Sequence, residues 1–244
     1  MIRPAAVLAI VTTLSLATPV SPAEAPVHQG LYAARATGIW DKIANSPGVR
    51  TTIVSPDGRS RATATFIDTA DGLVRITTSG RIGHGQIDIG PGVESELLWA
   101  PDSRAFFVTA SDQGAGGHYR TLVVAAGARD PVTRDLSPLI EREFGHPVAC
   151  GSRENPNVGG IRWDGSSSRL LVAAEIAPHS NCDSFGTFRA YLVDWRRMRI
   201  VRRFDQLEAK RRFRSALGEE LRAASDECVR TPKACWVSSN HPSR

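Results

Sequence analysis

The feature that most constrains the fold is the stretch at residues 96–124, ELLWAPDSRAFFVTASDQGAGGHYRTLVV. Its first apolar run ends at a turn containing Pro101-Asp102. Its second covers Ala105–Val108, and a turn of small residues at 111–117 leads into Tyr119–Val124. Pro and Asp preset the first turn, Gly supplies the unusual backbone angles of the second, and β-branched and aromatic residues fill the runs. The stretch therefore predicts a three-strand antiparallel meander.

Similar units precede and follow this stretch. The expected strands of the first unit are Thr51–Val54, Arg61–Ile67, Leu73–Thr77 and Ile82–Ile89, and those of the third are Ile161–Trp163, Leu170–Glu175, Thr187–Asp194 and Met198–Arg202. Trp163 aligns with Trp99, and Tyr191–Val193 aligns with Leu122–Val124. The pattern predicts a mainly β fold of about three antiparallel meanders.

Two of the turns resemble those of a known family. Trp-Ala-Pro-Asp-Ser at 99–103 and Val-Ser-Pro-Asp-Gly at 54–58 resemble the turn signature of WD-like β-propeller repeats of the Tol-system periplasmic type, over residues 50–203. The third copy reads Trp163-Asp164-Gly165, without the Pro-Asp pair, and closed propellers have ~4–8 blades. The resemblance therefore implies propeller-like meanders in an open or partial β-propeller. The whole chain is also similar to exported bacterial proteins, a likeness that implies no activity.

The N-terminus predicts export. Arg3 gives a positive start, Ala5–Ala17 is apolar and uncharged, and Ser21-Pro22-Ala23 places small residues at the −3 and −1 positions of a cleavage site. The apolar run is shorter than the ~20 residues that span a bilayer. We therefore expect a signal peptide at residues 1–23, no transmembrane segment after its removal, and a periplasmic or secreted protein.

The remaining chain is expected to form one domain. It comprises an N-terminal lead-in at 24–48, a propeller-like repeat domain at 49–204 with an insertion at 127–158, and a C-terminal helical segment at 205–244 packed on the same domain. Within the lead-in, Leu31–Ile43 fits either a short helix or an extended segment. In the insertion, Ser137 as N-cap and Pro138 at the first helical position predict a short helix.

The C-terminal segment predicts an amphipathic helix. Asp205 is expected to cap it, and Gly218 is expected to divide it. Its apolar residues recur at helical intervals, at Leu207, Phe213, Leu217, Leu221, Ala224 and Cys228. We expect this helix to cover a sheet edge or an open core face that three meanders leave exposed.

The cysteines indicate disulfides. They are Cys150, Cys182, Cys228 and Cys235. An even count in an exported chain favours two bridges, and the local pairing Cys150–Cys182 with Cys228–Cys235 is preferred among three connectivities. His146 and His179 lie close to the first pair in sequence, so a tetrahedral zinc site is the competing interpretation. Export favours the disulfides, and we expect neither a metal nor another cofactor.

Candidate ligand-binding residues lie in the loops that close two of the meanders. They are Asp112, His118, Tyr119, His179 and Asp183. Both loops should lie at the same end of adjacent meanders, where propellers bind partners, and paired carboxylates there suit calcium or a cationic ligand. The competing interpretation is that Asp and Gly are simply the residues that turns require.

Charge and missing motifs bear on function. The net charge is +5, and the basic run Arg196–Arg214 fits either a contact surface for anionic polymers or a solvated face. No Gly-x-Ser-x-Gly, Ser-x-x-Lys or His-Glu-x-x-His motif occurs, so no catalytic residue is identified.

We therefore expect a non-enzymatic binding or scaffolding module of the cell envelope. Its partner would be another envelope protein or an anionic envelope polymer, not nucleic acid. The alternative is a hydrolase or lyase that uses Asp112, His118, His179 and Asp183.

Overall fold

The structure is a computed structural model that describes residues 30–39, 50–68, 73–90, 95–111, 118–144, 155–176 and 186–230, without the side chains of Asp68, Glu227 and Cys228. The expected signal peptide lies outside the described residues. So do Cys150, Cys182 and Cys235, and with them both expected disulfides and the competing zinc site.

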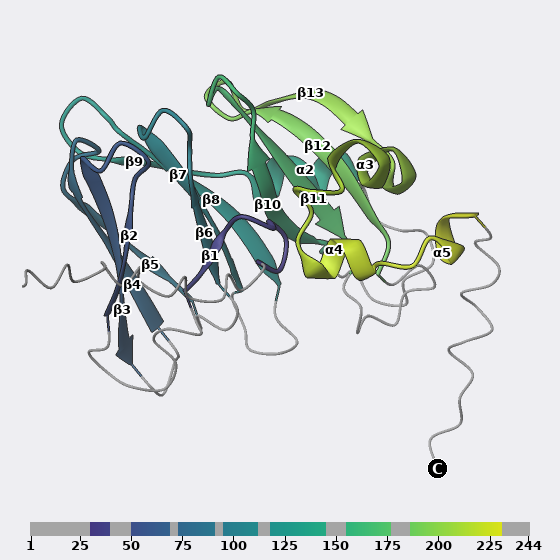
Figure 1. Ribbon diagram of the computed structural model, residues 1–244, viewed down its shortest axis with the longest axis horizontal. Coiled ribbons are helices and arrows are strands. Elements are labelled where there is room, and N and C mark those ends of the chain that lie inside the picture. Colours follow the sequence, from purple (N-terminus) through teal and green to yellow (C-terminus); the bar gives the residue numbers. More distant parts are fainter. Residues whose placement is uncertain are drawn as a thin grey trace, which may run out of the picture.

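Three antiparallel sheets and a few short helices make up the described chain, so the prediction of a mainly β fold is confirmed (Figure 1). The first sheet has the order β2 (Arg50–Val54), β3 (Ser60–Asp68), β4 (Leu73–Gly80) and β5 (Gly85–Ile89). The second has the order β1 (Thr37–Gly38), β6 (Glu96–Trp99), β7 (Ala105–Ser111), β8 (Tyr119–Ala125) and β9 (Val132–Asp135). The third has the order β10 (Asn157–Trp163), β11 (Arg169–Glu175), β12 (Phe188–Asp194) and β13 (Arg199–Phe204). The helices are α2 (Ser137–Phe144), α3 (Gln206–Phe213), α4 (Glu219–Ala223) and α5 (Glu227–Arg230).

Some element boundaries differ from the sequence expectations. In the described lead-in, residues 30–39, bends and a turn lead into the two-residue strand β1, which pairs with the start of β6. Strand β5 begins at Gly85 instead of Ile82, because Gly80 and Gly83 adopt φ values of +88° and +100° and form a turn there. The insertion contributes β9, which pairs with β8 and had not been expected.

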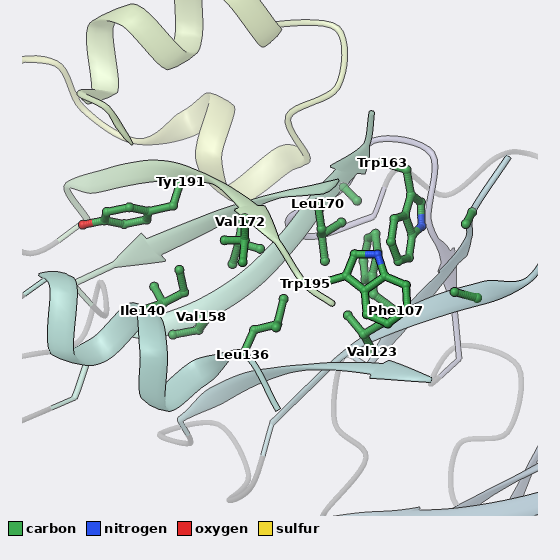
Figure 2. Packing of buried hydrophobic residues seen from close by; sticks show 14 of the residues in the cluster. Phe107, Val123, Leu136, Ile140, Val158, Trp163, Leu170, Val172, Tyr191 and Trp195 are labelled. Atoms are coloured by element: carbon green, nitrogen blue, oxygen red, sulfur yellow. The ribbon is translucent and has the colours of Figure 1, made fainter. Parts of the chain in front are cut away.

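The sheets stack face to face, and the second sheet is buried on both of its faces. Phe106 and Val108 of β7 pack against the first sheet, whereas Phe107 packs against the third. Alternate residues of a strand point to opposite faces, so a strand between two cores needs a continuous apolar run. Figure 2 shows the core between the second and third sheets, where Phe107, Trp163 and Trp195 lie close together.

The outer faces of the first and third sheets differ in polarity and in what covers them. The outer face of the first sheet is polar. Its Thr52 and Thr63 hydroxyls lie 3.0 Å apart, and Arg75 donates two hydrogen bonds to Asp88. The outer face of the third sheet is apolar and is covered by the C-terminal helices (Figure 1), with Leu217 fully buried. The C-terminal segment therefore covers a sheet face, one of the two expected alternatives.

The turns after β2, β6 and β10 share one geometry. Gly58, Ser103 and Ser167 occupy the same turn position and have positive φ values of +72°, +61° and +56°. In each turn the N–H of this residue donates to the carbonyl three residues earlier, which belongs to Ser55, Ala100 and Asp164 respectively. The third turn therefore keeps the geometry of the other two without a Pro-Asp pair.

The expectations for the helix starts were partly right. The Asp205 carboxylate accepts a hydrogen bond from the Glu208 N–H at 2.7 Å, and Gly218 precedes α4, as expected. The expected N-cap at Ser137 was wrong. Its hydroxyl instead accepts a hydrogen bond from the Thr121 N–H of β8 at 3.0 Å, and the Leu136 carbonyl accepts the first helical bond of α2.

Two adjacent glycines allow β10 to lie between large aromatic rings. A Cβ atom at Gly159 would lie 2.1 Å from the ring of Tyr32, and one at Gly160 would lie 2.6 Å from the ring of Phe107. Because real Cβ atoms do not approach other atoms so closely, both positions require glycine. Their bare backbone lets β10 lie directly against both rings.

Candidate functional site

The structure describes two of the predicted ligand-binding residues, His118 and Tyr119. Asp112, His179 and Asp183 lie outside the described residues. The His118 Nε2 atom lies 2.7 Å from the Pro156 carbonyl oxygen and 3.4 Å from a Glu141 carboxylate oxygen. These contacts connect the start of β8 to α2 and to the segment that enters β10.

Tyr119 adjoins a buried aromatic residue of the lead-in. Its N–H donates to the Asn157 side-chain oxygen at 3.2 Å, and its ring centroid lies 5.4 Å from that of Tyr32. Tyr32 is 1% exposed. The predicted candidate Tyr119 therefore borders a buried cluster that the sequence did not indicate.

This buried carboxyl cluster consists of Tyr32, Glu96 and Glu175, all no more than 2% exposed. The Glu96 carboxylate accepts hydrogen bonds from the backbone N–H groups of Tyr32 at 3.2 Å and Ala33 at 3.1 Å. The Tyr32 hydroxyl donates to Glu175 at 3.0 Å. Tyr32 therefore links β6 of the second sheet to β11 of the third.

The same segment also holds the C-terminal helices. The carbonyls of Tyr32, Gly30 and Leu31 accept hydrogen bonds from the N–H groups of Gly218, Glu219 and Glu220, at 2.7 Å, 3.1 Å and 3.1 Å. The first N–H groups of a helix have no partner within the helix, so these carbonyls satisfy groups that would otherwise be left unpaired. Residues 30–33 thus bind the second sheet on one side and α4 on the other.

Burial governs the ionisation of the buried carboxyl cluster. It raises the pKa of Glu96 to about 8, against the lowering effect of the hydrogen bonds from Tyr32 and Ala33. It also raises the pKa of Glu175 to about 8, and the charge of Glu220 adds to the rise. Among the described groups, the Glu175 Oε1 atom is a buried oxygen without a hydrogen-bond partner. The neutral acid is therefore the form that this environment favours.

Among the described side chains, no group of three or more His, Cys, Asp or Glu is placed to hold a metal ion. Within the same residues, no helix has the length and apolar character needed to cross a membrane.

A cleft of about 460 Å³, which we call the arginine cleft, opens beside the interface of the second and third sheets. Its lining residues are Arg104, Ala125, Ala126, Gly127, Val132, Arg134, Trp195 and Arg196. The arginines come from three separate segments: the turn before β7, strand β9 and the turn after β12. The described residues of the lining include no acidic side chain, so the cleft suits a negatively charged ligand.

The three guanidinium groups of this cleft have no carboxylate partner within the described part of the chain. Asp135, next to Arg134, pairs with Arg120, and Asp194, near Arg196, pairs with Arg197. Asp102, near Arg104, accepts a hydrogen bond from the Arg104 backbone N–H at 3.0 Å. The guanidinium of Arg196 lies over the Trp195 ring, 4.9 Å from its centroid. The cleft therefore combines uncompensated positive charge with a fixed aromatic wall.

A second cleft, of about 300 Å³, is formed where the lead-in and the C-terminal segment meet the same two sheets. Its lining includes Arg35, Trp99, Arg162, Trp163 and Asp164. The Arg162 Nε–H donates to the Trp163 carbonyl at 3.3 Å, and Asp164 offsets part of the positive charge. This cleft is smaller and less basic than the arginine cleft.

Ion pairs engage five of the nine basic residues in the run 196–214. Ion pairs join Arg197 to Asp194, Arg202 and Arg212 to Glu208, Arg203 to Glu143, and Lys210 to Asp226. Most of this run therefore behaves as a solvated face, and Arg196 is the member that lines the arginine cleft.

Sequence reasoning missed both the buried carboxyl cluster and the arginine cleft. A signal for the cluster existed, because Glu96 and Glu175 each stand at the end of an otherwise apolar strand. No comparable signal existed for the cleft, since Arg104, Arg134 and Arg196 are far apart along an arginine-rich chain.

No protein-family model matches this chain, and a search of curated proteins finds no relative.

Proposed function

We propose that this protein is a non-enzymatic binding module of the cell envelope. It binds anionic ligands at one end of the sheets, where the turns that follow Trp99 and Trp163 lie. The observation that carries the proposal is the arginine cleft, with three arginines and no acidic side chain among the described residues of its lining. Such a lining offers attraction and hydrogen bonds to an anion but no general base or nucleophile.

The proposed architecture is an open, propeller-like array of three meanders. Its support is the shared geometry of the turns, together with contacts that recur between neighbouring sheets. The Asp57 N–H donates to the Ser103 hydroxyl at 3.0 Å, and the Asp102 N–H donates to the Ser167 hydroxyl at 3.1 Å. The outer face of the first sheet is polar and can face solvent, and the C-terminal helices cover the outer face of the third sheet. In this proposal the array therefore ends at these two faces.

The proposed location in the envelope is supported by the signal-peptide pattern of residues 1–23. An anionic envelope polymer suits both this compartment and the charge of the cleft. The hydrolase or lyase alternative receives no comparable support from the described residues, because the contacts of His118 join structural elements to one another. Its other residues, Asp112, His179 and Asp183, lie outside the described residues.

Binding to immobilised acidic polymers tests the proposal. Biolayer interferometry of the purified protein on poly-L-glutamate and on long-chain polyphosphate should show saturable binding that weakens with added salt, and no binding to neutral dextran. Size-exclusion analysis of the polymers after incubation should show no shortening. Failure to bind either polymer at low salt would contradict the proposal, and polymer cleavage would favour the enzymatic alternative.

A further inference from the structure

The arginine cleft has a geometry that selects among anions. Its arginines stand on three separate segments, namely the turn before β7, strand β9 and the turn after β12, so they border the ligand space from different elements. A planar carboxylate accepts hydrogen bonds mainly within one plane, whereas a tetrahedral phosphate offers acceptor oxygens in several directions. Each guanidinium presents a rigid fork of donors that fits two oxygens at once.

The size of the cleft indicates a ligand with more than one charged group. Its volume of about 460 Å³ falls within the range of ~300–1,000 Å³ of small-molecule sites. Uncompensated guanidinium groups in one cleft repel one another, and a multiply charged anion relieves more of this repulsion than a single charge does.

The second cleft serves as an internal comparison. It is also basic, but Asp164 lies in its lining and the Arg162 Nε–H is engaged by a backbone carbonyl. Anion binding should therefore be weaker there, although both clefts adjoin the same pair of sheets.

We infer that the arginine cleft is a phosphate-recognition site, in which Arg104, Arg134 and Arg196 bind a ligand carrying two or more linked phosphate groups. This inference rests on the proposed function and names the ligand class of the same site. The wall formed by Trp195 holds Arg196 in place by stacking and limits the rotamers available to it.

Isothermal titration calorimetry at fixed ionic strength tests the inference, with sodium tripolyphosphate and citrate as probes. Tripolyphosphate should bind more tightly than citrate by about 10-fold or more. The variants Arg104→Gln, Arg134→Gln and Arg196→Gln should each weaken tripolyphosphate binding by about 10-fold, the loss expected for a charged hydrogen bond. The matched control Arg211→Gln removes the same charge from the exposed surface of α3 and should leave the affinity within about 2-fold of the parent.

A lysine series separates specific recognition from general attraction. Arg134→Lys keeps the charge but loses the fork, so a site that reads phosphate geometry should still lose affinity. Circular dichroism melting of every variant checks that it is folded. If Arg134→Lys lowers the melting temperature, the tripolyphosphate affinity of Arg104→Lys provides the same test in a second variant. Full affinity in both lysine variants, or equal affinity for citrate, would overturn the inference.

Vesicle sedimentation distinguishes two sources of the phosphate. Cleft-dependent binding to cardiolipin vesicles, whose headgroup carries two phosphates joined through a glycerol, but not to phosphatidylcholine vesicles, would identify a lipid headgroup as the ligand. Binding to tripolyphosphate alone would identify a soluble phosphate chain. Polymer binding that persists when all three arginines are replaced would overturn the assignment of the cleft and leave the proposed function standing, whereas a parent protein that binds no acidic polymer would overturn both.

Discussion

The Trp163 indole N–H donates a hydrogen bond to the Leu98 backbone carbonyl, 3.1 Å away in the neighbouring sheet. The Trp99 indole makes the corresponding bond to the Ile53 carbonyl at 3.2 Å. Both rings are about 5% exposed and end the first strand of their meander. Each tryptophan therefore connects its own sheet to the one before it through both apolar packing and a directed hydrogen bond.

Replacement of these tryptophans should reveal both contributions. Trp163→Ala should lower the free energy of unfolding by ~3–5 kcal/mol, because it leaves a large cavity beside Phe107. Trp163→Phe keeps part of the ring and should lose less. Urea midpoints of these variants and of the Trp99 counterparts provide the measurement, and a small loss at either alanine variant would contradict the equivalence of the two positions.

Ser103 has a strained backbone conformation, and its hydroxyl accepts a hydrogen bond from the neighbouring sheet. Its φ is +61°, and its hydroxyl accepts the Asp57 N–H across the boundary between two sheets. Ser103→Ala keeps the strain and loses the bond, so it should cost ~1–2 kcal/mol. Ser103→Gly also loses the bond but relieves the strain, as Gly58 does in the first turn. Thermal melts should therefore rank glycine above alanine, and the reverse order would show that strain is unimportant here.

The pH dependence of stability should follow the buried carboxyl cluster. Burial raises the pKa of Glu175 from an ordinary value of 4.5 to about 8, so the folded protein disfavours the charged form. Its contribution to stability is fully present below pH 4.5 and is lost as the pH rises through about 8, at up to ~1.4 kcal/mol per pH unit. The free energy of unfolding should therefore fall between pH 5 and pH 9 by this route.

Glu175→Gln isolates this effect. The amide is neutral at every pH and keeps an oxygen to accept the Tyr32 hydroxyl bond. Denaturant titrations at several pH values should show a shallower decline for the variant, with its relative advantage largest at alkaline pH. Parallel curves for the parent and the variant would contradict a buried, neutral Glu175.

Truncation after Phe204 tests the role of the C-terminal helices. It removes Leu217 and Leu221, exposes the apolar outer face of the third sheet, and deprives residues 30–33 of their bonds to α4. The shortened chain should aggregate or become sensitive to protease, as measured by light scattering and limited proteolysis. A monomer that melts like the full chain would show that these helices serve a partner instead.

The sequence by itself determined the local elements of this protein. Turn residues and apolar runs decide where a strand begins and ends, because steric limits on the backbone and the two-residue period of a strand act over a few residues. The Asp205 cap is equally local, since it acts on an N–H three residues away. For the same reason the mainly β class and most strand positions were predicted correctly.

Tertiary structure alone decided which faces meet and where a ligand site arises. The expected Ser137 cap failed because its hydroxyl instead accepts a hydrogen bond from the Thr121 N–H of β8, which precedes it by 16 residues in the chain. Tyr32 became the link between Glu96 and Glu175 only when the lead-in was placed between two sheets. The arginine cleft depends on the same long-range packing, since nothing in the chain near Arg104 specifies that Arg134 and Arg196 will line the same cleft.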